Sequence, residues 1–240
     1  MQSGEVATPS VSALIMAYNE VTGLEPVVRE ACAVLLRCAP AWEVVIIDDG
    51  STDGTGPLAD RLAGELLGVR AVHHAPNQGL GAVYQTGFRE ARCECVIFLP
   101  ADGEISPAVI ERFLPRMAEA DLVLGYLPDR PAPLLAKALS AAERLLFRVL
   151  FGTFPRFQGA LMFRRALFDT VELRTQGGRG WTVLMELILK ADRGGHRWVN
   201  EPTELRPRLG GQSKVRNVRT VLANLQQVLA LRRTMGRAAR

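Results

Sequence analysis

Short apolar runs alternate with stretches of helical periodicity through the first half of the chain, and this alternation limits the possible folds more than any other feature. We expect strands rich in apolar residues at 11–17, 43–47, 69–73, 96–99 and 121–124, and helical patterns near 22–37, 57–67, 81–92 and 107–119 separate them. The second run contains VVII (44–47), which is typical of a parallel strand covered by helices on both faces. The pattern predicts an α/β fold with a Rossmann-like, mostly parallel sheet.

Polar residues stand where three of these runs end. The first run leads into AYNE (17–20), the second into DDGSTDG (48–54), and the fourth into PADGE (100–104). The carboxyl ends of parallel strands meet at one edge of a sheet, where α/β folds bind their ligands. Carboxylates at such an edge suit a hard cation or a phosphate-bearing ligand. We therefore expect the functional site at these strand ends.

The second half of the chain has a different pattern. After a proline-rich connection, we expect a helix at 134–151, a strand at 157–163, a helix at 181–191, a strand at 197–200 and an amphipathic helix at 214–232. We interpret residues 1–125 and 126–240 as two halves of one domain. The second half would carry the amphipathic helices and a basic C-terminal tail.

Charge is distributed unevenly along the chain. The net charge is +4, yet nine of the 29 Lys and Arg residues lie between Leu205 and Arg240, where Asp and Glu are absent. This leaves 20 basic against 25 acidic residues in the remainder. A basic C-terminal surface suits an anionic partner. No nucleic-acid-binding motif or interleaved aromatic residues accompany these charges, so we expect no nucleic acid partner.

Cysteine usage and hydropathy bear on location. The four cysteines form no CxxC pair and no metal spacing with the three histidines, which favours reduced thiols in a cytosolic protein. The chain starts without the pattern of a signal peptide and has no run of 18 apolar residues. We expect a cytoplasmic protein with peripheral contact at the inner face of the membrane through the helix 134–151. A buried cross-helix is the alternative for that segment.

Together, these motifs resemble the family 2 glycosyltransferases, and most closely the dolichol-phosphate mannose synthase type. The likeness continues through GALMFRR (159–165), Gly180-Trp181 with Met185-Glu186-Leu187, and RPRLGGQSK (206–214), and covers residues 10–220. The resemblance implies an enzyme with the GT-A fold that uses a nucleotide-sugar donor. The Gln-x-x-Arg-Trp motif of polymerising members is absent from the sequence, which argues against a processive polysaccharide synthase.

The resemblance implies that the nucleotide sugar binds at the three strand ends. Carboxylates accept hydrogen bonds from a base or a ribose, and we expect Asp48 or Asp49 to do so. Capping of the following helix is their alternative role. Glycine at position 79 permits close backbone approach or close helix packing. The expected donor-binding residues are Ala17, Tyr18, Glu20, Asp48, Asp49, Ser51, Gly79 and Asp102.

In this family, an Asp-x-Asp motif holds Mg²⁺ or Mn²⁺ against the donor diphosphate. Here Pro100 stands at the first Asp position, Asp102 at the second, and Glu104 two residues later. Proline offers neither a side-chain oxygen nor an N–H group. We therefore expect Asp102 and Glu104 to act as a shifted metal-binding pair. The alternative is a plain surface turn in a protein that has lost its metal site.

A phosphate acceptor is largely ionised at neutral pH, so it needs cations to bind it rather than a general base. The resemblance implies that Arg206, Arg208, Ser213 and Lys214 bind that phosphate, with Arg130 as an addition from the proline-rich loop. Guanidinium groups bind phosphate oxygens in pairs. The implied partner is a polyprenyl phosphate or another lipid acceptor.

Three functions remain open at this point. The first is an inverting transferase that moves a hexose from a nucleotide sugar to a polyprenyl phosphate, with Asp102 as a catalytic residue. The second keeps the donor but uses a hydroxyl acceptor, with Glu186 as the catalytic base. The third is a binding protein with the GT-A fold that lost its catalytic power when proline came to occupy position 100.

Overall fold

The computed structural model describes residues 7–128, 145, 148–152, 156–157, 159–171, 173, 181–209 and 231–232. Its strands are β1 (Val11–Ala17), β2 (Trp42–Asp48), β3 (Val69–His73), β4 (Cys95–Pro100), β5 (Leu122–Tyr126), β6 (Leu161–Arg164) and β7 (Trp198–Pro202). Its helices are α1 (Leu24–Cys38), α2 (Thr55–Glu65), α3 (Leu80–Glu90), α4 (Val109–Arg116), α6 (Leu167–Thr170) and α7 (Trp181–Arg193).

The seven strands form one sheet in the order β3-β2-β1-β4-β6-β5-β7. β6 runs antiparallel to both of its neighbours, whereas the other pairs are parallel. The predicted α/β class with a mostly parallel sheet is therefore confirmed. The sheet contains strands from both sides of residue 125, and the division into two halves at that point stays a prediction.

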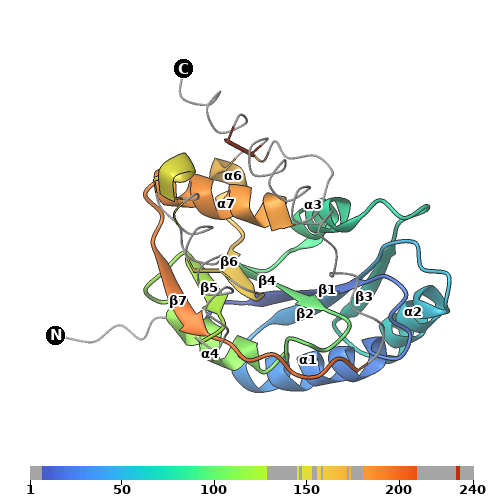
Figure 1. The fold of residues 1–240 in the computed structure, drawn as a ribbon. Coiled ribbons are helices and arrows are strands. Elements are labelled where there is room, and N and C mark those ends of the chain that lie inside the picture. The colour runs from blue at the N-terminus through green and yellow to red at the C-terminus, as the bar shows by residue number, and fades with distance from the viewer. Residues whose placement is uncertain are drawn as a thin grey trace.

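Helices cover both faces of the sheet, as Figure 1 shows. On one face, α1, α2 and α4 join a buried apolar cluster that includes Ala13 and Ile15. On the other face, α3, α6 and α7 join a second cluster that includes Leu14 and Phe98. Successive side chains of a strand point to opposite faces. An inner strand therefore needs apolar residues along its whole length, which explains the unbroken runs in the sequence.

Two elements are shorter than predicted. The helix expected at 107–119 is limited to α4, because Pro115 near its end has no N–H to continue the hydrogen-bond pattern. The strand expected at 157–163 begins only at Leu161. Gly159 has a φ of +94°, a left-handed conformation that interrupts an extended strand.

Several predictions concern residues that lie largely outside the described part of the chain. These include the helices expected at 134–151 and 214–232. In the part that is described, no helix has the length and apolar character needed to cross a membrane. All four cysteines are free, and burial raises the pKa of the Cys95 thiol to about 11. A thiol with so high a pKa is unreactive at neutral pH, in agreement with an incidental role.

Candidate functional site

The register of the parallel strands aligns their carboxyl ends. Ala17 of β1 pairs with Asp48 of β2, and Asp48 in turn pairs with His73 of β3. On the other side of β1, Met16 pairs with Pro100 of β4. The polar segments that follow β1, β2 and β4 therefore leave the sheet side by side. This arrangement is the one that the alternating sequence pattern predicts.

A cleft of about 380 Å³ opens at this edge of the sheet. Its lining includes several of the predicted donor, metal and acceptor residues, namely Ala17, Tyr18, Glu20, Asp49, Gly79, Asp102 and Arg208. The remaining lining residues are Met16, Asn77, Leu80, Val83, Pro100 and Ala101. The fold thus brings residues from the first strand and from the segment after the last strand into one cavity.

Asp49 holds the loop between β3 and α3 in position. Its Oδ1 accepts a hydrogen bond from the backbone N–H of Gln78 at 2.9 Å and lies 2.7 Å from His74 Nδ1. Its Oδ2 accepts from Asn77 Nδ2 at 2.8 Å and from the N–H of Gly79 at 2.9 Å. A carboxylate has about four acceptor sites, so these four contacts use all of them. Asp49 therefore shapes the cleft through the loop that it binds.

His74 connects Asp49 to α3. Because the carboxylate of Asp49 can only accept, His74 Nδ1 carries a proton and donates it, while Nε2 lies 2.8 Å from Thr86 Oγ1. His74 is only 8% exposed. Neither His74 nor Thr86 was predicted as a functional residue. The available signal was the pair of histidines at the end of the third strand, opposite the pair of aspartates in the parallel register.

Asp48 has a different environment from its neighbour and does not line the cleft. Its Oδ1 accepts from the N–H of Ser51 at 3.1 Å, and its Oδ2 lies 3.0 Å from His73 Nδ1. The other ring nitrogen of His73 lies 3.0 Å from Asp60 Oδ1. The hydrogen bond to Asp48, with a contribution from Asp60, raises the pKa of His73 above its usual value. Of the two aspartates predicted for the nucleotide, Asp49 is therefore the one at the cleft.

The turns after β1 and β2 are bonded to each other. Ser51 Oγ accepts from the N–H of Asn19 at 2.9 Å, and Asn19 Oδ1 accepts from the N–H of Thr52 at 2.8 Å. Ser51, predicted as a donor-binding residue, thus lies outside the cleft lining and supports the turn. At the start of α2, Asp53 Oδ1 accepts from the N–H of Thr55 at 3.0 Å. Asp48 and Asp49 make no such cap to α2.

Gly79 is required by its backbone conformation. Its φ of +83° and ψ of +164° lie in a region that essentially only glycine adopts. A Cβ at this position would meet no atom within 4 Å, so close packing is not the reason for the glycine. The conformation directs the N–H of Gly79 to Asp49 and brings this residue into the cleft lining.

The turn after β4 carries the predicted metal pair. Gly103, with a φ of +73°, reverses the chain, and Asp102 Oδ1 accepts from the N–H of Glu104 at 3.0 Å. Arg208 reaches both acids: Nη2 lies 3.3 Å from Asp102 Oδ2, and Nε lies 2.6 Å from Glu104 Oε1. A guanidinium group therefore occupies the position between the two carboxylates that the sequence assigned to a metal ion.

The acid pair is an incomplete site for a divalent cation. Among the described residues, no three His, Cys, Asp or Glu side chains come together as a cation cage. Pro100 adds no side-chain oxygen to Asp102 and Glu104. Mg²⁺ in proteins is often held by one or two carboxylates together with substrate phosphates. The pair therefore fits a cation that binds together with a phosphate-bearing ligand, and offers too few ligands to hold a cation by itself.

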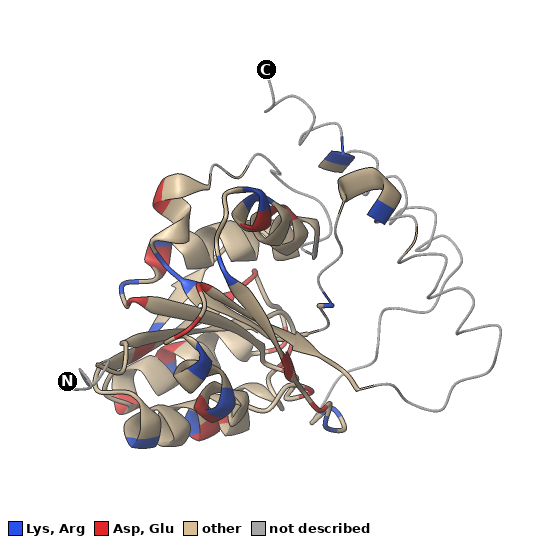
Figure 2. Ribbon diagram, turned by 90° about the vertical axis from the view of Figure 1, so that its left-hand side faces the viewer, with Lys and Arg blue, Asp and Glu red and all other residues tan. Residues whose placement is uncertain are grey.

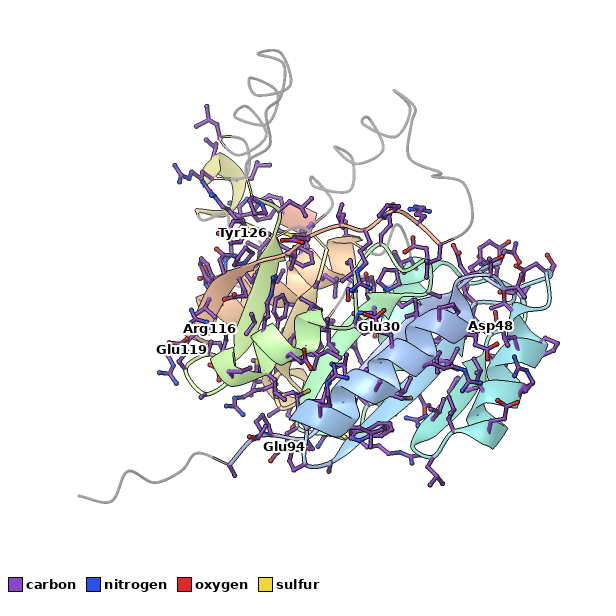
Figure 3. The ribbon with its side chains drawn as sticks, turned by 90° about the horizontal axis from the view of Figure 1, so that it is seen from below. Glu30, Asp48, Glu94, Arg116, Glu119 and Tyr126 are labelled. Carbon is purple, nitrogen blue, oxygen red and sulfur yellow. The ribbon has the colours of Figure 1, made fainter. Side chains whose placement is uncertain are left out.

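Other predicted residues lie away from this cleft. Arg206 Nη1 lies 3.0 Å from both carboxylate oxygens of Glu30, which Figure 3 labels on α1. Glu186 is fully buried on α7, and its Oε1 lies 2.6 Å from Lys190 Nζ. Neither residue is part of the cleft lining, and their roles stay predictions. Arg130, Ser213 and Lys214 lie outside the described residues.

Comparison with known families gives one match over most of the chain. A model described as "Glycosyl transferase family 2" matches residues 12–171. The matched segment begins in β1 and ends directly after α6, so it contains all three strand-end motifs and the turn that carries Asp102 and Glu104.

Three curated relatives cover nearly the whole chain. An undecaprenyl-phosphate mannosyltransferase of Micrococcus luteus is 29% identical over 85% of this chain and 87% of its own length. A polyprenol monophosphomannose synthase of Mycolicibacterium smegmatis is 30% identical over 84% of this chain and 79% of its own. A dolichol-phosphate mannosyltransferase of Mycosarcoma maydis is 25% identical over 95% of this chain and 80% of its own. Each of the three names mentions mannose together with a polyprenol.

Solved structures agree with the predicted GT-A fold. A mannosyltransferase of Pyrobaculum calidifontis, in complex with GDP-Man and Mn²⁺, has a TM-score of 0.59 at 20% identity and covers 82% of this chain and 56% of its own. A glucosyl-3-phosphoglycerate synthase of Mycobacterium tuberculosis, in complex with Mn²⁺, UDP and its product, has a TM-score of 0.65 at 17% identity and covers 93% of this chain and 78% of its own. At these identities the likeness concerns the fold.

Proposed function

This chain belongs to glycosyl transferase family 2, and we propose that it moves a hexose from a nucleoside diphosphate sugar to a polyprenyl phosphate. The names of its relatives support that acceptor class. One observation carries the proposal: a single cleft combines Asp102 in the turn after β4, the loop that Asp49 holds, and Arg208 from the segment after β7. At one reacting centre, a diphosphate donor needs acidic side chains that bind a metal ion. A phosphate acceptor needs a positively charged side chain.

The nucleoside part of the donor would bind between the turn after β1 and the loop that Asp49 holds. Tyr18 is 37% exposed at the rim and offers an aromatic face to a base. Glu20 lines the same cleft and offers carboxylate oxygens to ribose hydroxyls or base N–H groups. The backbone at Ala17 and Gly79 allows close approach on either side. The donor sugar would then lie toward Asp102.

Asp102 and Glu104 are the residues that would hold Mg²⁺ or Mn²⁺. Such an ion, when bound, stabilises negative charge that develops on the leaving diphosphate. The charge of the cleft supports the need for an added cation, because Glu20, Asp49 and Asp102 line it against the single guanidinium of Arg208. A diphosphate that entered this cleft alone would meet mostly negative charge.

The acceptor would react without a general base. A phosphomonoester is largely ionised at pH 7, so one of its oxygens can attack the anomeric carbon directly. The bond between that carbon and the diphosphate oxygen breaks, and its electron pair leaves with the nucleoside diphosphate. Attack from the side opposite to the leaving group inverts the anomeric configuration. Among the described residues, Arg208 is the cation in the cleft lining that would bind the acceptor phosphate. The segment RPRLGGQSK supplies Ser213 and Lys214 as further candidates from the sequence.

The alternative with a hydroxyl acceptor receives less support. That reaction needs a general base that can reach the acceptor oxygen. Glu186, the candidate base, has no exposed surface and pairs with Lys190 on the same helix. It also lies outside the cleft lining. A phosphate acceptor has no need of this residue and agrees better with the described geometry.

A lipid acceptor requires contact with a membrane surface. Leu145 is 64% exposed and Val149, four positions later, is 75% exposed, a spacing that places two helical residues on the same side. The exposed Arg148 lies beside them in the sequence. Apolar side chains flanked by a basic residue are typical of helices that lie in a membrane interface. We infer peripheral contact with the membrane through this segment.

The reaction can be tested with radiolabelled nucleotide sugars and a polyprenyl phosphate in detergent, followed by extraction into organic solvent. We expect labelled lipid with one of the GDP- or UDP-linked donors, and a product with inverted anomeric configuration by NMR. Asp102→Asn should lower the rate at least about 100-fold, because it weakens charge stabilisation at the leaving group. Asp169→Asn, the same change at an exposed acid outside the cleft lining, serves as the matched control.

The outcomes separate the three functions. Labelled lipid from one donor supports the proposal, and Glu186→Gln should then leave the rate near that of the unmodified chain. A large loss of turnover in Glu186→Gln would favour a hydroxyl acceptor instead. Absence of labelled lipid with every donor, in a protein that binds nucleotides, would reject a polyprenyl phosphate acceptor.

A further inference from the structure

Arg208 is held between the two acids by the backbone on both sides of it. The N–H of Arg206 donates to the carbonyl oxygen of Glu104 at 2.8 Å, and the N–H of Leu209 donates to the carbonyl oxygen of Asp102 at 2.9 Å. The segment 205–209 thus runs along the acid turn like an added strand. A side chain fixed in this way differs from a chance surface ion pair, whose partners lose entropy on meeting.

The guanidinium contacts are shared between the two carboxylates. Nη2 of Arg208 lies 3.3 Å from both Asp102 Oδ2 and Glu104 Oε2, and Nε lies 2.6 Å from Glu104 Oε1. Only 10% of the Asp102 side chain and 27% of the Arg208 side chain are exposed. A guanidinium group is not deprotonated in proteins, so Arg208 stays charged at every working pH.

The same oxygens would have to bind a divalent cation. Asp102 and Glu104 are the described carboxylates of the predicted metal turn, and Arg208 already neutralises part of their charge. A metal ion that enters must displace the guanidinium or accept a like charge beside it. A diphosphate that enters with the metal changes this balance, because its oxygens give the displaced guanidinium a new partner.

We propose that Arg208 and a divalent cation exchange on Asp102 and Glu104: Arg208 neutralises the empty site, and the cation that enters with the diphosphate releases Arg208 to phosphate oxygens. The diphosphate part of this inference rests on the proposed function. The exchange makes metal and nucleotide binding cooperative, since each ligand removes an obstacle for the other. It also explains how a site with proline at position 100 avoids binding the metal without the donor.

The test measures Mn²⁺ binding to the full chain by isothermal titration calorimetry, with and without GDP or UDP. In the unmodified protein, Mn²⁺ alone should bind weakly, and the nucleotide should tighten it about 10-fold or more. In Arg208→Gln, Mn²⁺ alone should bind about 10-fold more tightly, and the nucleotide should add little. Arg37→Gln is the matched control, because Arg37 bonds Glu111 through the same Nε and Nη2 atoms and neither residue lines the cleft.

Each result either supports or overturns the exchange. Tighter Mn²⁺ binding in Arg208→Gln but not in Arg37→Gln supports it, whereas unchanged or weaker binding in Arg208→Gln overturns it. If that variant does not fold, Arg208→Lys decides in the same way, because a compact ammonium cannot bridge both acids as the guanidinium does. Failure of both GDP and UDP to bind would reject the proposed donor. The Mn²⁺ titration without nucleotide would still decide the competition for the acid pair.

Discussion

At the scale of single residues, Asp48 and Asp49 show how neighbours with the same side chain acquire different tasks. Successive residues at a strand end point to opposite sides. Asp48 consequently bonds Ser51 and His73 beneath the sheet edge, while Asp49 holds residues 77–79 at the cleft. The structure selects Asp49 as the cleft residue of the pair.

Asp49→Asn should damage both the loop and the donor site. The amide would present an NH₂ group to donors that now meet an oxygen, so at least one of the four hydrogen bonds becomes a repulsive contact. We expect a loss of about 1–3 kcal/mol in the free energy of unfolding, measured with urea. Nucleotide affinity should fall as well, measured by calorimetry. Equal effects from Asp169→Asn, a change at an exposed residue, would contradict this role.

His73 should make the stability of the fold depend on pH. Its folded-state pKa is raised by Asp48 and then Asp60, so the protonated ring stabilises the native state. This contribution is complete below the unfolded value of about 6.5 and is lost as the pH rises through the folded pKa. His73→Gln should therefore cost more stability at pH 5.5 than at pH 9, measured by urea unfolding. A cost that grows with pH would contradict the assignment, and Asp60→Asn should show a weaker form of the same trend.

At the scale of elements, strand register is what assembles the cleft. The pairings of Ala17 with Asp48 and of Met16 with Pro100 bring three distant turns to one edge. A shift of one residue in β1 would exchange the side chains that face the two helical layers, so Leu14 would point into the cluster that now holds Ala13 and Ile15. Because both clusters are packed around the present side chains, such a shift is strongly disfavoured.

Two glycines in helices should respond to alanine in opposite ways. At Gly87 of α3, a Cβ would lie 2.6 Å from a ring carbon of Phe98 and 2.8 Å from Leu14 Cδ1, so either α3 or these buried side chains must shift. We expect Gly87→Ala to destabilise the protein by about 1–3 kcal/mol. At Gly64 of α2, a Cβ would meet no atom within 4 Å. Gly64→Ala should stabilise it by about 0.4–1 kcal/mol, since the unfolded chain loses freedom.

Urea unfolding of the two variants against the unmodified chain measures both effects. The pair is informative because the substitution is the same and both positions are helical. If both variants lost similar stability, the close packing of α3 on β4 would not be the cause.

At the scale of the whole molecule, the charge distribution suggests how the protein meets a surface. Acidic and basic positions are interleaved on the described helices, as Figure 2 shows. Several of them form ion pairs between elements, such as Arg61 with Glu25 and Arg37 with Glu111. The sequence after Leu205, in contrast, has basic residues and no acids. The C-terminal segment is therefore the candidate for electrostatic attraction to anionic lipid.

Co-sedimentation with vesicles tests that attraction. We expect binding to vesicles that contain phosphatidylglycerol, little binding to pure phosphatidylcholine, and loss of binding between 0.05 and 0.5 M salt. A variant with glutamine at 232, 233, 237 and 240 should bind at least about 10-fold more weakly, since each basic residue near such a surface contributes about 1 kcal/mol. Glutamine at 29, 37, 61 and 116 provides the control, and an equal loss there would contradict a localised role.

Most of the secondary structure could be predicted from the sequence because the relevant signals are local. Short strands rich in apolar residues were visible in the sequence between helical patterns, and two of them were predicted with the bounds that the structure has, at 11–17 and 69–73. The strand that became β6 was expected at 157–163, but its place between β4 and β5 and its antiparallel direction were not predicted, because a short apolar run carries no signal for its partners or direction. The polar strand ends were likewise visible in the sequence as the edge of the site.

The contents of that edge depended on contacts between distant parts of the chain. No local pattern could show that Asp49 would bind the loop at 77–79, or that Arg208 would lie between Asp102 and Glu104. Burial can be recognised in the sequence because it requires apolar side chains at regular intervals. The hydrogen-bond donor that each carboxylate meets has no such pattern in the sequence. It is determined only when the strands take their register and the segment 205–209 packs along the acid turn.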